Sequence, residues 1–193
     1  MKVRDSGMPD EEYWESLFDI ETAMQRVGPL TGVVDAVEFG SGYGTFSLPL
    51  AKKISGQLYA LELETDLIHR LKARAESQNV NNIILKQIDF VAQGTGIAAA
   101  SVDYVCLFNI LHFEEPVKLI DEARRILNPG GLLAVMHWRF DDKTPRGPAM
   151  DIRPTPEKMR LWLNTGKFQN SEFFDLPPYH YGFMAKKEVE WNL

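Results

Sequence analysis

A glycine-rich stretch carries the clearest chemistry in the sequence. An apolar run over residues 33–37 leads into Glu38 and Phe39, and the chain continues Gly40-Ser41-Gly42-Tyr43-Gly44-Thr45. Glycines in such a turn lack a Cβ atom and allow positive φ angles, so backbone can lie directly against a ligand. The spacing G-x-G-x-G brings the third glycine one residue earlier than the dinucleotide fingerprint G-x-G-x-x-G does. The stretch therefore predicts a turn that holds a nucleoside-containing ligand.

Polar residues also end three later apolar runs. The run over 57–63 closes with Glu62 and Leu63, a second run closes with Asp89 and Phe90, and a third leads through Asn109-Ile110 to His112. A carboxylate can accept hydrogen bonds from both hydroxyls of a ribose diol, so Glu62 is a candidate partner for a nucleoside sugar. Together these residues predict a binding edge at the carboxyl ends of parallel strands.

The elements that must position these residues follow a regular alternation. Strand-like runs cover about 33–39, 57–63, 82–88, 102–109 and 131–138. Between them, helical periodicity gives Leu67, Leu71 and Ala75 one shared face, and a helix opened by Pro116 another with Leu119, Ile120, Ala123 and Leu127. Alternating elements with nearly all-apolar strands indicate a parallel sheet covered by helices on both faces.

The two ends of the chain add further elements. Residues 9–27 predict one amphipathic helix, and Pro49 predicts that the helix after the glycine turn kinks or starts late. Residues 139–154 predict a structured loop, and Thr155-Pro156 predicts a last helix that runs to about Gly166. The tail around Pro177-Pro178 predicts a β-hairpin.

In this order, the motifs resemble those of class I S-adenosylmethionine (SAM)-dependent methyltransferases. The resemblance runs from about Val33 to His137, includes Asn128-Pro129-Gly130-Gly131, and is greatest to the small-molecule, ubiquinone/menaquinone-type (type 11-like) subgroup. It implies an α/β, three-layer Rossmann-like fold with a mostly parallel seven-stranded sheet and an antiparallel C-terminal hairpin. We expect one domain over 1–193, with a helical cover (1–30), a cofactor-binding core (33–138) and an acceptor-side region (139–193).

The resemblance also implies a cofactor and its contacts. SAM would bind, leaving S-adenosylhomocysteine (SAH) as product. Glu38 would help to orient the amino end of the methionine moiety through the turn or a water molecule, and Glu62 would accept from the ribose. Leu63 and Phe90 would flank adenine, and Asp89 would accept from its amine. The predicted cofactor-binding residues are Glu38, Phe39, Gly40, Ser41, Gly42, Gly44, Thr45, Glu62, Leu63, Asp89, Phe90, Asn109 and Ile110.

Two histidines are the candidate catalytic residues. His112 is the first candidate general base, because histidine ordinarily titrates near working pH, and His137, at the end of a strand, is the second. The alternatives are a helix-capping or substrate-shaping role for His112 and a structural role for His137.

Aromatic and basic residues could build the acceptor side of the site. Trp14, with Tyr13 and Phe18, could fold over the cofactor or dock plainly on the sheet. Arg139, Arg146 and Arg153 could clamp a carboxylate or phosphate, or pair with Asp141, Asp142 and Asp151 in the same loop. We predict Trp14, Arg139 and Arg146 as substrate-binding residues.

Composition narrows the class of acceptor and the cellular compartment that we expect. A net charge of −6 argues against nonspecific binding to nucleic acid, and Cys106, as the one cysteine, favours a cytoplasmic protein without an internal disulfide. No apolar stretch approaches the ~18 residues of a membrane span, and no apolar signal core follows the first residues. No metal-ligand spacing stands out, and the fourth-strand motif lacks the Asn/Asp-Pro-Pro-Tyr signature of amide or base N-methylation.

These observations favour a methyltransferase that acts on a small molecule through an O, N, S or C nucleophile, and on an anionic one if the loop arginines bind it. The alternative is a protein that binds SAM or SAH without transfer. An NAD-dependent oxidoreductase is a third reading, which the glycine spacing disfavours. The sequence leaves the acceptor and the oligomeric state open.

Overall fold

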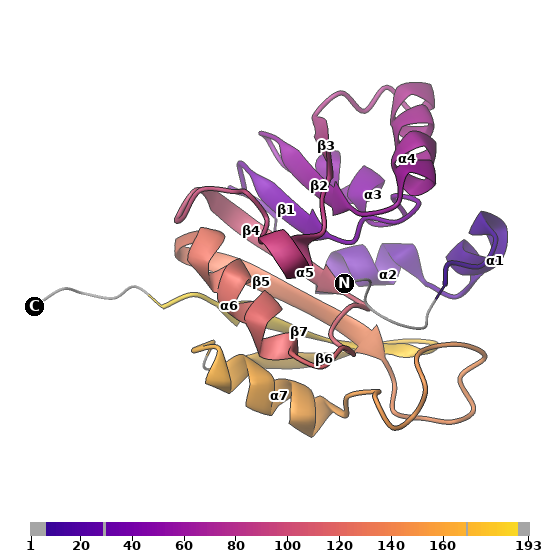
Figure 1. The fold of residues 1–193 in the computed structure, drawn as a ribbon, viewed down its shortest axis with the longest axis vertical. Coiled ribbons are helices and arrows are strands. Elements are labelled where there is room, and N and C mark those ends of the chain that lie inside the picture. The colour runs from indigo at the N-terminus through magenta and orange to yellow at the C-terminus, as the bar shows by residue number, and fades with distance from the viewer. Residues whose placement is uncertain (1–6, 29, 169, 189–193) are drawn as a thin grey trace, which may run out of the picture.

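A single twisted sheet organises the part of the chain that the computed structural model describes, residues 7–28, 30–168 and 170–188 (Figure 1). Its seven strands lie in the order β3-β2-β1-β4-β5-β7-β6. The first five run parallel, whereas β7 is antiparallel to both β5 and β6. The strands are β1 (Ala36–Phe39), β2 (Leu58–Glu62), β3 (Ile83–Gln87), β4 (Val102–Phe108), β5 (Leu127–Trp138), β6 (Glu172–Leu176) and β7 (His180–Lys186). The predicted α/β fold is confirmed.

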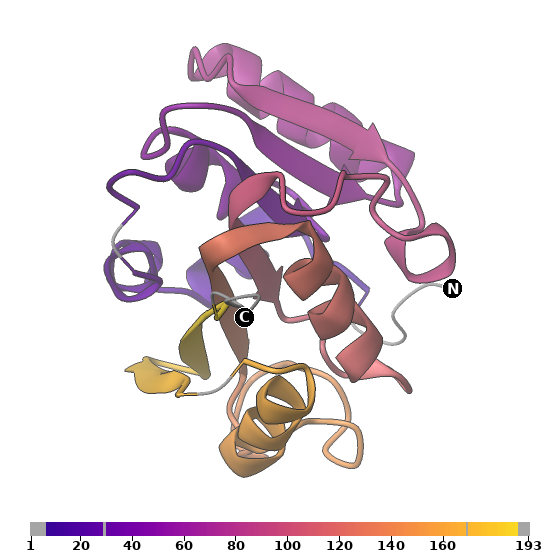
Figure 2. The same ribbon diagram turned by 90° about the vertical axis from the view of Figure 1, so that its left-hand side faces the viewer.

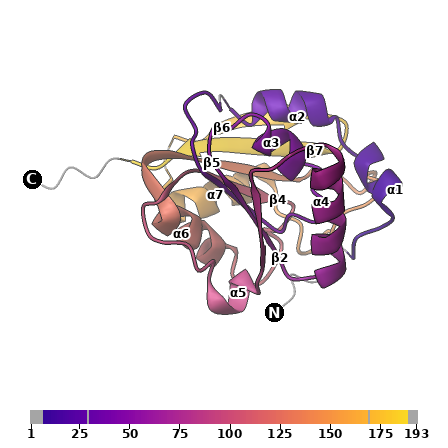
Figure 3. The same ribbon diagram turned by 90° about the horizontal axis from the view of Figure 1, so that it is seen from above.

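Helices cover both faces of this sheet. They are α1 (Glu11–Ser16), α2 (Ile20–Arg26), α3 (Ser47–Ala51), α4 (Thr65–Ser77), α5 (Phe90–Gln93), α6 (Pro116–Ile126) and α7 (Pro156–Thr165). The apolar sides of α2, α3 and α4 form one core with the sheet, and those of α5, α6 and α7 form another on the opposite face (Figure 3). On that second face α6 and α7 pack against each other (Figure 2).

The apolar pattern placed the crossover helices correctly. Leu67, Leu71 and Ala75 of α4 are buried, and α6 begins at Pro116 and buries Leu119, Ile120 and Ala123. Leu127, expected on α6, is instead the first residue of β5. The helix that contains Pro49 is short and does not begin until Ser47, in line with the expected late start.

The prediction of one helix over residues 9–27 is wrong, because the chain forms α1 and α2 with a break between them. Leu17 ends α1 and is buried, and the Asp19 carboxylate accepts a hydrogen bond from the Thr22 N–H at 3.0 Å, which caps a new helix. Helix α5 was not predicted. It begins where Asp89 Oδ1 accepts from the N–H groups of Val91 and Ala92.

Beyond β5 the predicted order of elements is confirmed. Residues 139–154 form an irregular loop, Thr155 caps α7, and β6 and β7 form the hairpin. The loop is organised around the buried Arg153, whose guanidinium donates to the carbonyl oxygens of Arg139, Asp141 and Pro148 and to Thr144 Oγ1. The first six residues, which were expected to carry no signal core, lie outside the described part of the chain.

Candidate functional site

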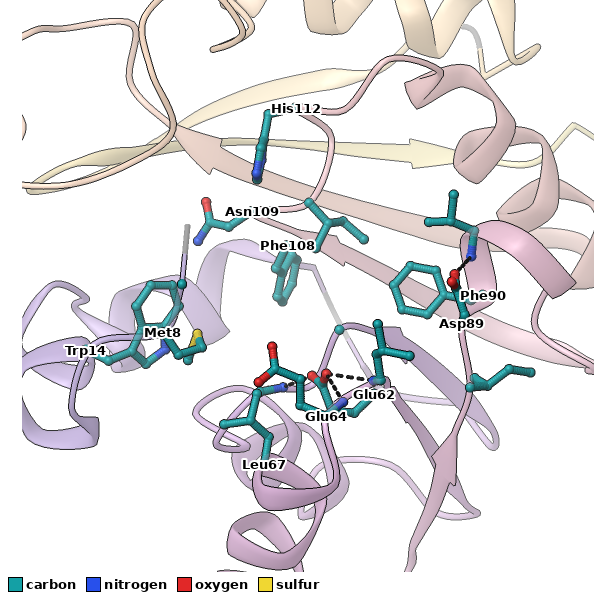
Figure 4. A pocket seen from close by; sticks show the side chains of 17 residues that line it. Met8, Trp14, Glu62, Glu64, Leu67, Asp89, Phe90, Phe108, Asn109 and His112 are labelled. Atoms are coloured by element: carbon teal, nitrogen blue, oxygen red, sulfur yellow. Dashed lines mark hydrogen bonds between the residues drawn. The ribbon is translucent and has the colours of Figure 1, made fainter. Parts of the chain in front are cut away.

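A pocket of about 850 Å³, counting the part that opens to solvent, lies at the carboxyl ends of β1, β2 and β4 (Figure 4). The glycine turn, the start of α5 and the segment before α1 complete its walls. Most predicted cofactor-binding residues line it: Gly40, Gly42, Glu62, Leu63, Asp89, Phe90, Asn109 and Ile110. The others lie beside it in the protein interior: Glu38, Phe39, Ser41, Gly44 and Thr45.

Gly42 and Gly44 of the turn are required for different structural reasons. Gly42 has φ +54° and lines the pocket, and a Cβ added there would lie 3.2 Å from Met8 Cε. Gly44 has φ +82° and does not line the pocket, but its Cβ would lie 2.2 Å from Leu71 Cδ1. Gly42 therefore keeps backbone accessible to a ligand, whereas Gly44 lets the turn pack against α4.

Glu62 ties the glycine turn to the end of β2. Its Oε2 accepts from the Gly42 N–H at 2.9 Å, and its Oε1 accepts from the N–H groups of Leu63 at 2.7 Å and Glu64 at 3.0 Å. A carboxylate oxygen has two lone pairs, so Oε2 can accept one more hydrogen bond. In this arrangement Glu62 keeps one acceptor position on Oε2, because three backbone N–H groups occupy the others.

Glu38 lies beneath the glycine turn and not in the pocket. It is 2% exposed, and its Oε2 accepts a hydrogen bond from Ser47 Oγ. Burial raises the pKa of Glu38 to about 8, although the Ser47 hydrogen bond opposes this rise, and the charge of Glu62 adds to it. Glu38 therefore lies in the interior beside the pocket rather than in its wall.

An apolar slot runs between the end of β2 and the start of α5. Leu63 forms one side, and Phe90, whose ring packs edge-on against Phe39 at 5.2 Å between centroids, forms the other. Asp89 lies at the same edge, with Oδ1 engaged in capping α5. Leu63 and Phe90 thus give this part of the pocket wall an apolar character.

Asn109 supplies an unsatisfied amide at the end of β4. Its backbone takes a left-handed conformation, with φ 56°, and its N–H donates to the Met136 carbonyl at 2.8 Å. The side chain is 9% exposed and points into the pocket, and neither its Nδ2 nor its Oδ1 has a hydrogen-bond partner among the described residues (Figure 4). Because a buried unpaired polar group costs about 1–3 kcal/mol, this amide favours a ligand with both a donor and an acceptor.

His112 lies between two cavities. Its ring, 4% exposed, points toward Asn109 in the first pocket, and the same residue lines a second cavity of about 1010 Å³ (Figure 4). Apolar side chains of Phe113, Ile152 and Trp162 contribute to that cavity, which lies near the start of α6 and along α7. His137, fully buried on β5, contacts His112, with 3.4 Å between His137 Nε2 and His112 Nδ1.

The N-terminal segment covers the first pocket. Met8 and Trp14 line it, whereas Tyr13 is 40% exposed, and Phe18 packs on Phe46 and His180. The segment is held by hydrogen bonds and ion pairs to the core: Tyr43 Oη to the Pro9 carbonyl at 2.8 Å, and Arg74 to Glu11 at 3.0 Å and to Glu15 at 2.6 Å. Sequence reasoning found Trp14 but missed Met8 and Arg74, for which no local pattern gave a signal.

The three loop arginines do not converge on the pocket. Arg139 pairs with Asp175 on β6 at 3.2 Å, and its Nε donates to the His180 carbonyl. Arg153 holds the loop together, as described above. Arg146 donates to the carbonyl of Gly7, which lines the first pocket. Of the three, only Arg146 lies at the edge of the site, and the expected pairing of Arg139 with aspartates of its own loop is replaced by the pair with Asp175.

The described residues contain neither a metal-binding cluster nor a membrane-spanning helix. Within residues 7–28, 30–168 and 170–188 there is no group of three or more His, Cys, Asp or Glu side chains placed to hold a metal ion. Over the same ranges, no helix combines the length and the apolar character needed to cross a membrane.

Known proteins are similar to this chain in sequence and in fold. An uncharacterized 37.1 kDa protein of transposon TN4556 from Streptomyces fradiae is 26% identical over 161 residues, which cover 78% of this chain and 46% of that protein. Ribosomal RNA small subunit methyltransferase A of Variovorax paradoxus is 29% identical over 143 residues, covering 63% and 54%. The chain thus spans about half the length of these curated relatives.

Solved structures agree on the fold. A SAM-dependent methyltransferase from Aquifex aeolicus superposes with a TM-score of 0.79 at 20% identity, covering 92% of this chain and 93% of that one. The [4+2]-cyclase SpnF superposes with a TM-score of 0.75 at 16% identity, covering 97% and 85%. A family model described as "Methyltransferase domain" (Methyltransf_11) matches residues 37–135, which include most of β1, all of β2 to β4 and most of β5. As its motifs predicted, the chain belongs to the type 11 methyltransferase domain family of class I SAM-dependent methyltransferases, and its cofactor is SAM.

Proposed function

We propose that the protein transfers a methyl group from SAM to a small-molecule acceptor. The observation that carries this proposal is the buried amide of Asn109, which lines the pocket together with His112 and has no hydrogen-bond partner in the described part of the chain. An amide that can both donate and accept hydrogen bonds suits the amino and carboxylate groups of the methionine moiety of SAM. A histidine beside it is placed to accept or donate a proton.

The residues around the pocket fit the cofactor. The backbone of Gly40 and Gly42 together with Asn109 would hold the methionine moiety, Glu62 would accept from the ribose, and the slot beside Leu63 would take adenine. When bound, SAM supplies a methyl group already activated by its sulfonium. The chain's own residues therefore have to bind SAM and the acceptor, align them and exclude water, rather than activate the donor.

Two groups of residues supply these functions. Met8 and Trp14 line the pocket on the side that faces Asp89 and Phe90, where they would limit the access of water (Figure 4). His112 is the base we propose for acceptors that must lose a proton on methylation. The proton would move to the imidazole, while the electron pair of the broken bond stays on the acceptor atom that receives the methyl group.

We place the acceptor in the second cavity, because His112 lines both cavities and so marks where they meet. The walls from Phe113, Ile152 and Trp162 favour a small acceptor with an apolar body. The polar rim carries Glu114 and Asp151 as well as Lys158, so it gives an anionic acceptor only weak support.

The relatives bear on the acceptor class in two ways. The Variovorax relative is named for methylation of ribosomal RNA, yet the net charge of −6 and the apolar second cavity favour a small molecule here. SpnF is named as a cyclase although it has the same fold, which keeps a SAM-binding protein without methyl transfer as the alternative.

Calorimetric titration with SAM and SAH tests the proposal. We expect binding to the wild-type protein, a loss of at least about tenfold in affinity for Asn109→Ala, and unchanged binding for Asn164→Ala, which alters an exposed asparagine on α7. Equal affinities of the wild-type and Asn109→Ala proteins would contradict the assigned site.

Transfer itself needs a separate measurement. Incubation with SAM labelled on its methyl group and a small-molecule extract should move the label into a new product. Tight binding of SAM with no transfer in any extract would instead favour the alternative, a binding protein.

A further inference from the structure

Two histidines, His112 in the segment after β4 and His137 near the end of β5, form a chain of contacts that leads to the protein interior. His112 Nδ1 lies 3.4 Å from His137 Nε2, and His137 Nδ1 lies 3.4 Å from the carbonyl oxygen of Trp138. His137 is 0% exposed and lines neither cavity. Only His112 of this pair reaches the pocket, where its ring points toward Asn109 (Figure 4).

The partner of each nitrogen determines where the protons lie. A carbonyl oxygen only accepts hydrogen bonds, so His137 Nδ1 must carry a proton to bond with Trp138. Burial lowers the pKa of His137 well below its ordinary value, and the charges of His112, His180 and Arg153 add to the effect, so His137 is neutral. A neutral imidazole has one N–H group, which leaves His137 Nε2 as an acceptor.

The tautomer of His112 follows from that of His137. Since His137 Nε2 can only accept, the hydrogen bond between the rings requires His112 Nδ1 to donate. Neutral His112 then has its lone pair on Nε2. This tautomer is the one that a base acting through Nε2 requires.

We infer that His137 is a positioning residue, which holds neutral His112 in the Nδ1–H tautomer and so keeps Nε2 ready to accept a proton from the acceptor. The tautomer itself is independent of the proposed function, whereas its use in methyl transfer rests on it. In the proton-transfer step, the covalent bond between the acceptor atom and its hydrogen breaks, and the electron pair stays on the acceptor atom. The proton forms a new bond with the lone pair of His112 Nε2. The imidazolium that results keeps its hydrogen bond from Nδ1–H to His137, which stays neutral. This assignment replaces the earlier prediction of His137 as a second base.

NMR of protein labelled with ¹⁵N on histidine side chains tests the inference, because long-range ¹⁵N–¹H couplings distinguish the two neutral tautomers. We expect His112 to be Nδ1–H in the wild-type protein and to change to Nε2–H in His137→Phe, which keeps an aromatic ring but removes the acceptor. His137→Gln, whose carbonyl reaches about as far as imidazole Nε2, should restore the Nδ1–H form. The exposed His69 on α4 should show the same spectrum in all three proteins.

A kinetic readout follows once an acceptor is found. We expect kcat to fall at least about tenfold in His137→Phe and to recover substantially in His137→Gln, with the affinity for SAM unchanged in both. Nε2–H on His112 in the wild-type protein, or Nδ1–H retained in His137→Phe, would overturn the inference even if the enzyme transfers methyl groups. If the tautomers are as expected and SAM does not bind, the proposed function fails while the positioning contact stands.

Discussion

The buried carboxyl group of Glu38 should make the stability of the protein depend strongly on pH. Glu38 lies under the glycine turn, 2% exposed, with Ser47 Oγ as hydrogen-bond donor and Glu62 nearby. Burial raises its pKa from 4.5 to about 8. The informative perturbation is Glu38→Gln, which keeps the shape and an oxygen that can accept from Ser47 but cannot ionise.

The sign and the size of the effect follow from linkage. Between pH 4.5 and about pH 8 the folded protein keeps a proton on Glu38 that the unfolded chain releases, so ionisation favours unfolding as pH rises. This contribution to stability is complete below pH 4.5 and is lost as pH rises through about 8. At ~1.36 kcal/mol per pH unit, the wild-type protein should lose up to about 5 kcal/mol of unfolding free energy relative to Glu38→Gln across that range.

Urea unfolding followed by circular dichroism at several pH values between 4.5 and 8.5 measures this difference. The wild-type and Glu38→Gln proteins should have similar unfolding free energies at the acidic end, and the variant should be the more stable at the alkaline end. Glu172→Gln, at an exposed position on β6, controls for the loss of one carboxylate. Unfolding free energies that stay parallel within about 1 kcal/mol for the wild-type and Glu38→Gln proteins would refute the reasoning.

Two further predictions concern packing and the acceptor. Gly44→Ala should lower the free energy of unfolding by about 1–3 kcal/mol more than Gly32→Ala, because both have positive φ but only the first brings a Cβ within 2.2 Å of Leu71; equal losses in urea unfolding would count against this contact. Trp162→Ala should raise the KM for the acceptor about tenfold and leave the affinity for SAM unchanged, since Trp162 lines only the second cavity. The neighbouring Leu161→Ala, at a 62% exposed position, should change neither value, and an unaltered KM in Trp162→Ala would remove the acceptor from that cavity.

Some departures from the sequence-based predictions have local physical causes. Asp19 can be either an exposed residue within a helix or the cap that starts one, and the apolar pattern of residues 9–27 does not distinguish these. The break coincides with the burial of Leu17 at the end of α1 and with the Asp19 cap that begins α2. Asp89 similarly had an expected role toward a ligand, and its capping of α5 became visible only with the backbone that follows it.

The glycine turn could be predicted from the sequence, whereas the partners of the arginines could not. The reason is again whether the interaction is local. The positive φ angles of Gly42 and Gly44 could be anticipated, because their spacing after an apolar strand requires a tight turn. The separate reasons for them depend on Met8 and Leu71, which reach the turn from other elements. Long arginine side chains can satisfy their charge in many directions, so nothing local indicated that Arg139 turns to Asp175.

The sequence by itself determined the fold class and the edge at which the site lies. Apolar runs that each end in a polar residue produce parallel strands, and the carboxyl ends of parallel strands meet at one edge, which brings Glu62, Asp89 and Asn109 to the same pocket. Only the tertiary structure decided that His112 contacts His137 and that Trp14 lines the pocket. These contacts join elements far apart in the chain, and their geometry depends on strand register and loop direction, which local sequence patterns do not specify.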